Sequence, residues 1–212
     1  MLDLHHALVI QITDLGVVSR DELLRRVAAV ETLATEVRAA RIVLLRDPAV
    51  PPRDLLTLAR DLRAATRAVG ARLWVNDRLD VAALVEADGV HLGRRSVGVD
   101  DARCLLGTSI TVSVACHDVD EVLAARDSGA DAATLSPIFA SPGKGAPLGV
   151  EALAAARARL GPDPRFALIA LGGVDHASSG SCLAAGADGL AAIRADLLVT
   201  PARLVADLRR GY

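Results

Sequence analysis

The amino-acid sequence predicts a closed (β/α)8 barrel, the TIM-barrel fold, built as a single domain over residues 1–212. Two observations carry this prediction. Short runs rich in Val, Ile and Leu alternate with longer segments of helical periodicity, which is the pattern of βα units on a parallel sheet. Such runs number eight, and a chain of 212 residues lies within the size range of the fold.

The eight apolar runs have the length and composition of strands that are covered on both faces. They are Ala7–Thr13, Arg41–Leu45, Arg72–Val75, Gly89–Leu92, Ser109–Val114, Ala132–Ser136, Phe166–Leu171 and Gly189–Ile193.

Between the strands, Leu, Val and Ala recur every three or four residues against Arg, Asp and Glu, as in amphipathic helices. These segments include Asp21–Ala40, Pro52–Val69, Asp118–Ser128, Val150–Leu160 and Pro201–Arg210. The residues expected as N-caps are Ser19, Asp100, Asp118 and Thr200.

A doubly wound open sheet is the alternative architecture. We favour the closed barrel because the repeats are even and no G-x-G-x-x-G fingerprint follows the first strand. No linker-like change in composition divides the chain. In a barrel, functional residues lie on the loops that follow the carboxyl ends of the strands.

Composition excludes several classes of partner. The chain has 24 Lys+Arg against 26 Asp+Glu and 2% aromatic residues, so it offers neither a basic excess nor stacking platforms for nucleic acid. No apolar run reaches the roughly 18 residues of a membrane span, and the N-terminus lacks the basic start of a signal peptide. The three cysteines are widely spaced and suit a reducing compartment. We expect a complete cytoplasmic protein, and the sequence leaves a homodimer open.

Glycines follow the seventh predicted strand and begin the eighth. Gly172 and Gly173 directly follow the predicted strand Phe166–Leu171. Gly189 is the first residue of the next predicted strand, which ends at Ile193 and is followed by Arg194. Many barrels bind phosphate between these two strand ends, where backbone N–H groups approach the anion because glycine has no Cβ. Two tight turns are the alternative interpretation.

A flexible loop follows the sixth strand and begins at Ser141. It carries Lys144, which is the only lysine in the chain. A lysine ammonium binds a phosphate as a point charge. A solvated surface lysine is the alternative, because loops carry charged residues freely.

Polar residues also follow the third, fourth and fifth strands. Asp77 has a carboxylate suited to Mg²⁺ and Asn76 an amide suited to a heterocycle, although Asp77 could equally cap the next helix. His91 and His117 lie at neighbouring strand ends, where a histidine can serve acid–base chemistry or satisfy buried backbone groups.

Short motifs recur along the chain in a defined order. They are Ile12–Asp14, Leu45-Arg46, Val75–Arg78, Ala87–Gly93, Cys116-His117, Gly129–Asp131, Ser136–Phe139, Lys144, Leu148-Gly149, Ala170–Gly173 and Ala185–Gly189. In order and spacing the series resembles the thiamine phosphate synthase family and its TenI-type thiazole tautomerase relatives. The fold of that family is a (β/α)8 barrel, in agreement with the strand count.

The resemblance implies a transferase that joins hydroxymethylpyrimidine diphosphate to thiazole phosphate, with release of pyrophosphate and formation of thiamine phosphate. In family members the diphosphate leaves first, and the thiazole nitrogen captures the pyrimidine carbocation. Such a reaction requires cations and Mg²⁺ around the leaving group, a dry pocket and a cradle for the second phosphate. The expected partners are therefore small phosphorylated heterocycles.

The resemblance also assigns roles to single residues. Arg46 and Lys144 would hold the diphosphate, and Asp77 would ligate Mg²⁺. Asn76 and His91 would contact the pyrimidine. The expected site comprises the catalytic residues Arg46 and Lys144, the metal ligand Asp77, and the substrate-binding residues Asn76, His91, Ser141, Gly172, Gly173, Ile193 and Arg194.

The chain departs from the family pattern at several strand ends, and in the loop after the sixth strand it keeps the lysine and one hydroxyl of a Thr-x-Thr-Lys motif. Pro48 stands where a diphosphate-binding lysine is expected, and Ser96 stands where the Gly-Gln-Glu-Asp motif supplies a second carboxylate for Mg²⁺. Arg194 replaces a serine after the last strand. Our hypothesis is that Arg94, Arg95 and Arg194 replace the missing charge, since guanidinium groups bind phosphate bidentately.

Two alternative functions remain open from the sequence. One is a TenI-like thiazole tautomerase, although Pro137 stands where those relatives carry a histidine. The other is a non-catalytic barrel that binds thiamine-related phosphates, which the losses at Pro48 and Ser96 favour. The retained Asn76, Asp77, Pro137 and Lys144 favour the synthase.

Overall fold

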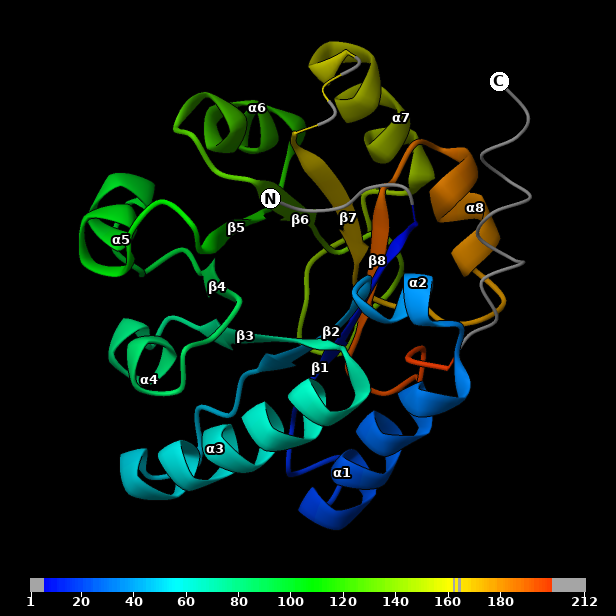
Figure 1. Cartoon of the computed structure of the whole chain (residues 1–212). Coiled ribbons are helices and arrows are strands. Elements are labelled where there is room, and N and C mark those ends of the chain that lie inside the picture. Colours follow the sequence, from blue (N-terminus) through cyan, green and yellow to red (C-terminus); the bar gives the residue numbers. More distant parts are fainter. Residues whose placement is uncertain (1–5, 162, 164, 200–212) are drawn as a thin grey trace.

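The computed structural model describes residues 6–161, 163 and 165–199. Its parallel strands close into a barrel in chain order, and β8 pairs with β1 to complete it (Figure 1). The strands are β1 (Leu8–Ile12), β2 (Arg41–Leu45), β3 (Arg72–Asn76), β4 (Gly89–Leu92), β5 (Thr111–Cys116), β6 (Ala132–Leu135), β7 (Ala167–Leu171) and β8 (Gly189–Ala192). The predicted closed (β/α)8 barrel is confirmed, and every strand overlaps its predicted run. An open doubly wound sheet is excluded because each strand has two paired neighbours.

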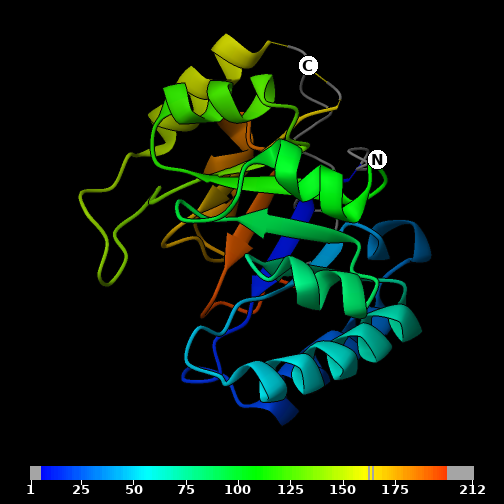
Figure 2. The ribbon, with the colours of Figure 1, turned by 90° about the vertical axis from the view of Figure 1, so that its left-hand side faces the viewer.

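Helices surround the barrel and cover the outer face of the sheet (Figure 2). In the part of the chain that the structure describes they are α1 (Arg20–Ala29), α2 (Thr35–Arg38), α3 (Pro52–Val69), α4 (Leu79–Leu84), α5 (Val99–Leu106), α6 (Val119–Asp127), α7 (Val150–Leu160) and α8 (Ser179–Ala184). The predicted helix Pro201–Arg210 and its N-cap Thr200 lie outside the described residues. None of the helices described is long and apolar enough to cross a bilayer.

The predicted helix Asp21–Ala40 is wrong as a single element. It is divided into α1, a short 3-10 turn and α2. The hydroxyl of Thr32 donates to the carbonyl of Ala29 at 2.7 Å, and the guanidinium of Arg38 donates to the carbonyl of Leu33 at 2.9 Å. These side chains bind backbone carbonyls that a continuous helix would use for its own hydrogen bonds.

Two of the predicted N-caps in the described part of the chain are confirmed. Ser19 caps α1 and Asp118 caps α6, each by accepting a backbone N–H three residues further on. Asp100 is not a cap, because α5 already begins at Val99 and Asp100 lies in its first turn. Its carboxylate there still favours the helix through the positive end of the helix dipole.

The apolar core has two regions. The larger lies between the sheet and the helices, and the smaller fills the barrel interior with residues such as Ile10, Ile42 and Ile169. The single tryptophan, Trp74, belongs to the interior region and is fully buried. Its indole lies against Gly89 of the next strand, where a Cβ would approach the ring to 2.5 Å. The glycine therefore makes room for the largest side chain inside the barrel.

Three aspartates stand immediately before β4, β6 and β8, and we call them the aspartate clasps. Each carboxylate accepts a hydrogen bond from a backbone N–H of the preceding strand and pairs with an arginine of a nearby helix. The sets are Asp88 with Leu73 and Arg63, Asp131 with Val112 and Arg103, and Asp188 with Leu168 and Arg157. The backbone N–H of each aspartate also donates to a carbonyl of the same preceding strand. Each clasp thus joins two neighbouring strands and one helix.

We expect removal of one clasp to destabilise the whole barrel. In an Asp131→Ala variant, Arg103 loses its ion-pair partner and the backbone N–H of Val112 loses its acceptor. Because both groups are partly buried, the free energy of unfolding should fall by about 2 kcal/mol. Urea unfolding followed by Trp74 fluorescence measures this change.

The matched control is Asp127→Ala, because Asp127 forms an ion pair on the surface with its neighbour Arg126. Its effect should stay below about 0.5 kcal/mol. Equal losses of stability in the two variants would contradict a special role for the clasp.

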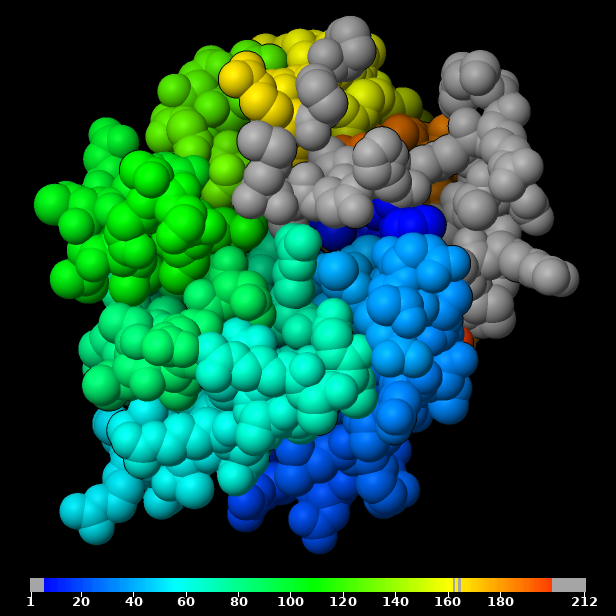
Figure 3. Space-filling model, viewed as in Figure 1, coloured from blue at the N-terminus to red at the C-terminus, as the bar shows by residue number. Residues whose placement is uncertain are grey.

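The two ends of the barrel differ in character. Figures 1 and 3 look onto the end at which the strands begin, and the clasps lie at this end. A cavity of about 590 Å³ also lies here, between α4 and α5, with Arg72, Leu105 and Thr111 in its lining. It is therefore remote from the strand ends at which functional residues are expected.

Candidate active site

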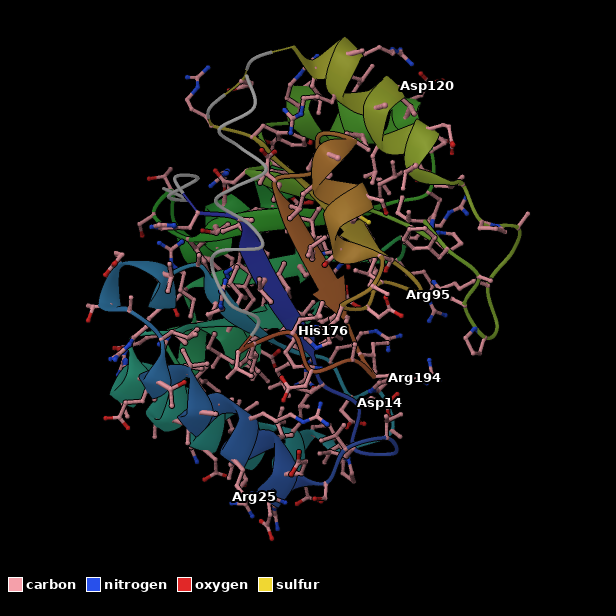
Figure 4. All side chains as sticks on the ribbon, turned by 90° about the vertical axis from the view of Figure 1, so that its right-hand side faces the viewer. Asp14, Arg25, Arg95, Asp120, His176 and Arg194 are labelled. Carbon is pink, nitrogen blue, oxygen red and sulfur yellow. The ribbon has the colours of Figure 1, made fainter. Side chains whose placement is uncertain are left out.

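The carboxyl ends of all the strands lie at the same end of the barrel, which we call the mouth. It faces away from the viewer in Figure 1 and lies at the left in Figure 2. Figure 4 shows Asp14 after β1, Arg95 after β4 and Arg194 after β8 along this same end. The predicted gathering of strand-end residues therefore corresponds to one face of the molecule.

Asp77 directly follows β3 and ties it to β4. Its backbone N–H donates to the carbonyl of His91 at 3.0 Å. One carboxylate oxygen, Oδ1, accepts the N–H of Gly93 at 2.9 Å and the hydroxyl of Ser96. The other, Oδ2, accepts the side-chain amide of Asn76 at 2.7 Å. Both carboxylate oxygens are thus occupied by donors of the chain itself.

The alternative role of Asp77 as a helix cap is wrong. The N-cap position of α4 belongs to Arg78, and no side chain caps that helix. Asp77 instead has a φ of 58°, in the left-handed region that few residues other than glycine adopt. This backbone turn directs its carboxylate toward the loop after β4.

His91 lies inside the barrel mouth on β4. It is 6% exposed, and its Nδ1 lies 3.1 Å from the hydroxyl of Ser113 on β5. Burial lowers the pKa of His91 to about 4, and the charge of Arg46 acts in the same direction while that of Asp77 opposes it. The imidazole is therefore neutral near pH 7. These interactions also place Arg46, Asp77 and His91 in one electrostatic neighbourhood.

The lowered pKa of His91 predicts a loss of stability in acid. Its folded-state pKa of about 4 lies below the usual value, so between these two pH values the unfolded chain binds a proton that the folded chain does not. Between pH 6.5 and pH 5 this should cost about 1.5 kcal/mol of unfolding free energy. A His91→Gln variant should lose correspondingly less stability over that interval, as measured by urea unfolding at both pH values. The same pH dependence in both proteins would contradict the prediction.

The loop after β2 is tied to the loop after β1. The hydroxyl of Thr13 accepts a hydrogen bond from the backbone N–H of Arg46 at 2.9 Å. The same hydroxyl donates a hydrogen bond to the backbone carbonyl of Arg46 at 3.2 Å. Asp47 is buried and accepts the N–H of Leu15 at 2.7 Å. The backbone of Arg46 is therefore held, while its guanidinium is exposed to solvent.

The loop after β6 projects past the strand ends. Figure 2 shows it extending from the barrel on the side of the mouth. Within it, the N–H of Lys144 donates to the carbonyl of Ser141 at 3.2 Å, and the hydroxyl of Ser141 lies 3.3 Å from the carbonyl of Phe139. Ser141 and Lys144 are thus on a turn that stands out from the barrel. The structure does not bring them into hydrogen-bonding contact with the residues of β3 and β4.

Gly172 and Gly173 follow β7 with φ values of 96° and 65°. A Cβ at Gly172 would lie 2.7 Å from the Cα of Pro137, and one at Gly173 would lie 2.7 Å from the Cβ of Phe139. The N–H of Phe139 donates to the carbonyl of Gly172 at 2.9 Å. The glycines are therefore required for a tight turn packed against the segment after β6, and their phosphate-binding role stays a prediction.

β8 ends beside a buried amide that sequence reasoning missed. Gln11 of β1 is 1% exposed, and its Nε2 donates to the carbonyl of Ile193 at 2.8 Å. Its Oε1 has no partner among the described residues. A polar residue in the otherwise apolar β1 was the signal that could have identified it. Arg194, the next residue after Ile193, is exposed.

Five cations at the strand ends have no anionic partner in the described part of the chain, whereas Arg78 pairs with Asp80. No described residue forms an ion pair with the side chain of Arg46, Arg94, Arg95, Lys144 or Arg194. The ion pairs lie elsewhere, above all on the helices and at the clasps. Unpaired cations gathered at one end of a protein attract anions.

Comparison with known proteins identifies the family. The family model described as thiamine monophosphate synthase matches residues 12–195. The chain belongs to the thiamine monophosphate synthase family. The family predicted from the strand-end motifs is thus confirmed.

Individual members of the family are similar over most of the chain. A putative thiamine-phosphate synthase of Geobacter sulfurreducens is 42% identical over 158 residues, which cover 73% of this chain and 72% of that protein. The thiamine-phosphate synthase of Moorella thermoacetica is 38% identical over 159 residues, with 74% of each chain covered. Among solved structures, thiamine phosphate pyrophosphorylase from Pyrococcus furiosus aligns with a TM-score of 0.77 at 26% identity, covering 98% of this chain and 96% of that one.

Proposed function

We propose that the protein is a thiamine-phosphate synthase, an enzyme that transfers the pyrimidinylmethyl group of hydroxymethylpyrimidine diphosphate to the nitrogen of a thiazole phosphate. Membership of the family and the names of its relatives support this proposal. The observation that carries it is the arrangement at the mouth. Asn76, Asp77 and His91 adjoin one another at the ends of β3 and β4, and Arg46 acts on the same imidazole from the end of β2.

The reaction breaks one bond and forms one. The C–O bond between the pyrimidine methylene and the diphosphate breaks, and pyrophosphate leaves with the electron pair. The lone pair of the thiazole nitrogen then forms the new C–N bond, which yields thiamine phosphate without a net proton transfer. Catalysis therefore depends on stabilising charge and holding the two substrates in line.

The neutral imidazole of His91 suits this chemistry. A positive charge develops on the pyrimidine when the diphosphate leaves, and a protonated histidine beside it would oppose that charge. Burial keeps the pKa of His91 at about 4, so the ring carries no charge at neutral pH. Asn76, which neighbours His91 across the β3–β4 pairing, would hydrogen-bond the pyrimidine ring.

The remaining roles follow the charges of the mouth. Arg46 and Lys144 would bind the diphosphate, with Lys144 and Ser141 brought to it by the projecting loop after β6. The backbone of Gly172, Gly173 and Ile193, together with Arg194, would receive the phosphate of the thiazole.

Magnesium is generally required in the family, but the residues present in this chain do not fit it. Asp77 is the one predicted ligand, and both of its oxygens accept hydrogen bonds from Gly93, Ser96 and Asn76. No group of three His, Cys, Asp or Glu within the described ranges is placed to hold a metal ion. A divalent ion prefers several oxygen ligands, so we assign no step of the reaction to it.

A thiazole tautomerase is the second candidate. The Nδ1 of His117 lies 3.0 Å from the carbonyl of Ser136, the residue before Pro137. A histidine from the end of β5 thus reaches the segment in which tautomerase relatives carry theirs. Isomerisation of the thiazole precursor without thiamine phosphate formation would select this function. Binding of thiamine phosphate without either reaction would select the non-catalytic barrel.

We also propose a cytoplasmic location and small phosphorylated heterocycles as the partners. The cysteines Cys104, Cys116 and Cys182 are all free thiols in the structure, which suits a reducing compartment. A homodimer stays a prediction that sedimentation analysis would test.

The proposed function predicts thiamine phosphate and pyrophosphate as products. Both should appear in equal amounts when the purified protein is incubated with hydroxymethylpyrimidine diphosphate and thiazole phosphate, as measured by liquid chromatography. An Arg46→Ala variant should lower kcat/KM about 100-fold, because a charged donor at the leaving group is removed. Arg60→Ala is the control, since Arg60 is an exposed residue of α3 outside the proposed site. Absence of both products with the wild-type protein would refute the synthase.

A further inference from the structure

The loop that follows β4 has a composition and a set of contacts that a metal site does not explain. It runs from Gly93 to Ser96 and carries two adjacent arginines at its centre. The N–H of Ser96 donates to the carbonyl of Gly93 at 3.0 Å, which closes the segment into a turn. Arg94 and Arg95 are exposed, and neither forms an ion pair with a described residue.

Asp77 holds this turn at both of its ends. Its Oδ1 accepts the N–H of Gly93 at 2.9 Å and also the hydroxyl of Ser96. A Cβ at Gly93 would lie 3.3 Å from the same oxygen, so the turn approaches the carboxylate closely. Asp77 itself has a left-handed backbone, and such conformations persist only where the surroundings determine them. The contact between Asp77 and the turn is therefore a built feature of the mouth.

Ser96 allows the contact with Asp77 to form without a cation, because its side chain is a hydroxyl and not a carboxylate. Two facing carboxylates repel each other and need a cation between them. A serine hydroxyl instead donates a hydrogen bond to the aspartate, which satisfies the carboxylate without any cation. In this chain the pair Asp77 and Ser96 is complete as it stands.

We propose that Asp77 is a positioning residue, which locks the turn after β4 and presents Arg94 and Arg95 to the phosphate groups of the leaving diphosphate in place of a metal ion. The identity of the anion rests on the proposed function. Figure 4 shows Arg95 on the same end of the molecule as Arg194. Guanidinium groups bind phosphate oxygens bidentately and remain charged at any working pH, so a pair of them supplies the charge that departing pyrophosphate needs.

Binding of inorganic pyrophosphate tests the proposal without any turnover. Isothermal titration calorimetry of the wild-type protein in EDTA should show binding, and added Mg²⁺ should change the dissociation constant less than about threefold. The double variant Arg94→Ala/Arg95→Ala should bind at least about tenfold more weakly in EDTA, because it removes two guanidinium groups that donate charge-assisted hydrogen bonds to the anion. Arg60→Ala is the matched control and should bind as the wild type does. Wild-type binding that requires Mg²⁺, or a double variant that binds normally, would overturn the proposal.

Variants of Asp77 separate a positioning role from a metal-binding one. Asp77→Asn keeps an oxygen that can accept the N–H of Gly93, so it should retain pyrophosphate affinity in EDTA within about threefold. Asp77→Ala releases the turn and should bind at least about tenfold more weakly. Equal losses in the two variants would show that the carboxylate charge itself matters and would refute the positioning role. Circular dichroism establishes that each variant is folded.

Ser96→Asp supplies the converse test, because it places a second carboxylate against Asp77. The two acids should repel each other in EDTA and weaken pyrophosphate binding at least about tenfold, and Mg²⁺ should restore it. A Ser96→Asp variant indifferent to Mg²⁺ would contradict the inference. Since none of these measurements requires product formation, a protein that binds pyrophosphate as predicted but makes no thiamine phosphate would refute the proposed function alone.

Discussion

The aspartate clasps are the interaction on which the closed barrel depends. Parallel strands cannot be joined by tight turns, so the register of each strand pair must be fixed by contacts between residues that are far apart in the sequence. Asp88, Asp131 and Asp188 provide such contacts at alternate junctions, and each binds a backbone N–H, a helix arginine and its own strand neighbour. They fix the register at the end where the strands begin. Side chains packed inside the barrel, such as Trp74 against Gly89, keep the strands in the same register up to the mouth.

The mouth is built by the opposite strategy. Among the described residues, two of its aspartates are satisfied by donors of the chain, and Arg46, Arg94, Arg95, Lys144 and Arg194 form no ion pairs. Asp77 is occupied by Gly93, Ser96 and Asn76, and Asp47 by the backbone of Leu15. The arginines of the mouth therefore face solvent and any anion that enters it. The buried imidazole of His91 has a lowered pKa and is neutral near pH 7, so it adds no positive charge to the barrel interior.

Much of the fold could be predicted because buried parallel strands leave a strong local signal. Each is a continuous apolar run, and the observed strand ends differ from the predicted ones by only a few residues, as with Ser109, which lies before β5. The break in Asp21–Ala40 could not be predicted, because it depends on Thr32 and Arg38 reaching carbonyls of the turn. The site was predictable as a set of strand ends. Its inner contacts were not, since the Asp77–Ser96 bond and the role of Gln11 arise only when distant segments meet.

The aspartate clasps belong to the sequence motifs by which the family is recognised. Asp88, Asp131 and Asp188 lie within the Ala87–Gly93, Gly129–Asp131 and Ala185–Gly189 motifs, which helped to identify the family. They lie at the end of the barrel remote from the mouth, so these aspartates stabilise the fold and do not contact the proposed site. Pro48 and Ser96 alter the opposite rim without touching a clasp. Part of the family signature thus reflects the construction of the barrel, so a relative can change its chemistry at the mouth and still be assigned to the family from these three motifs.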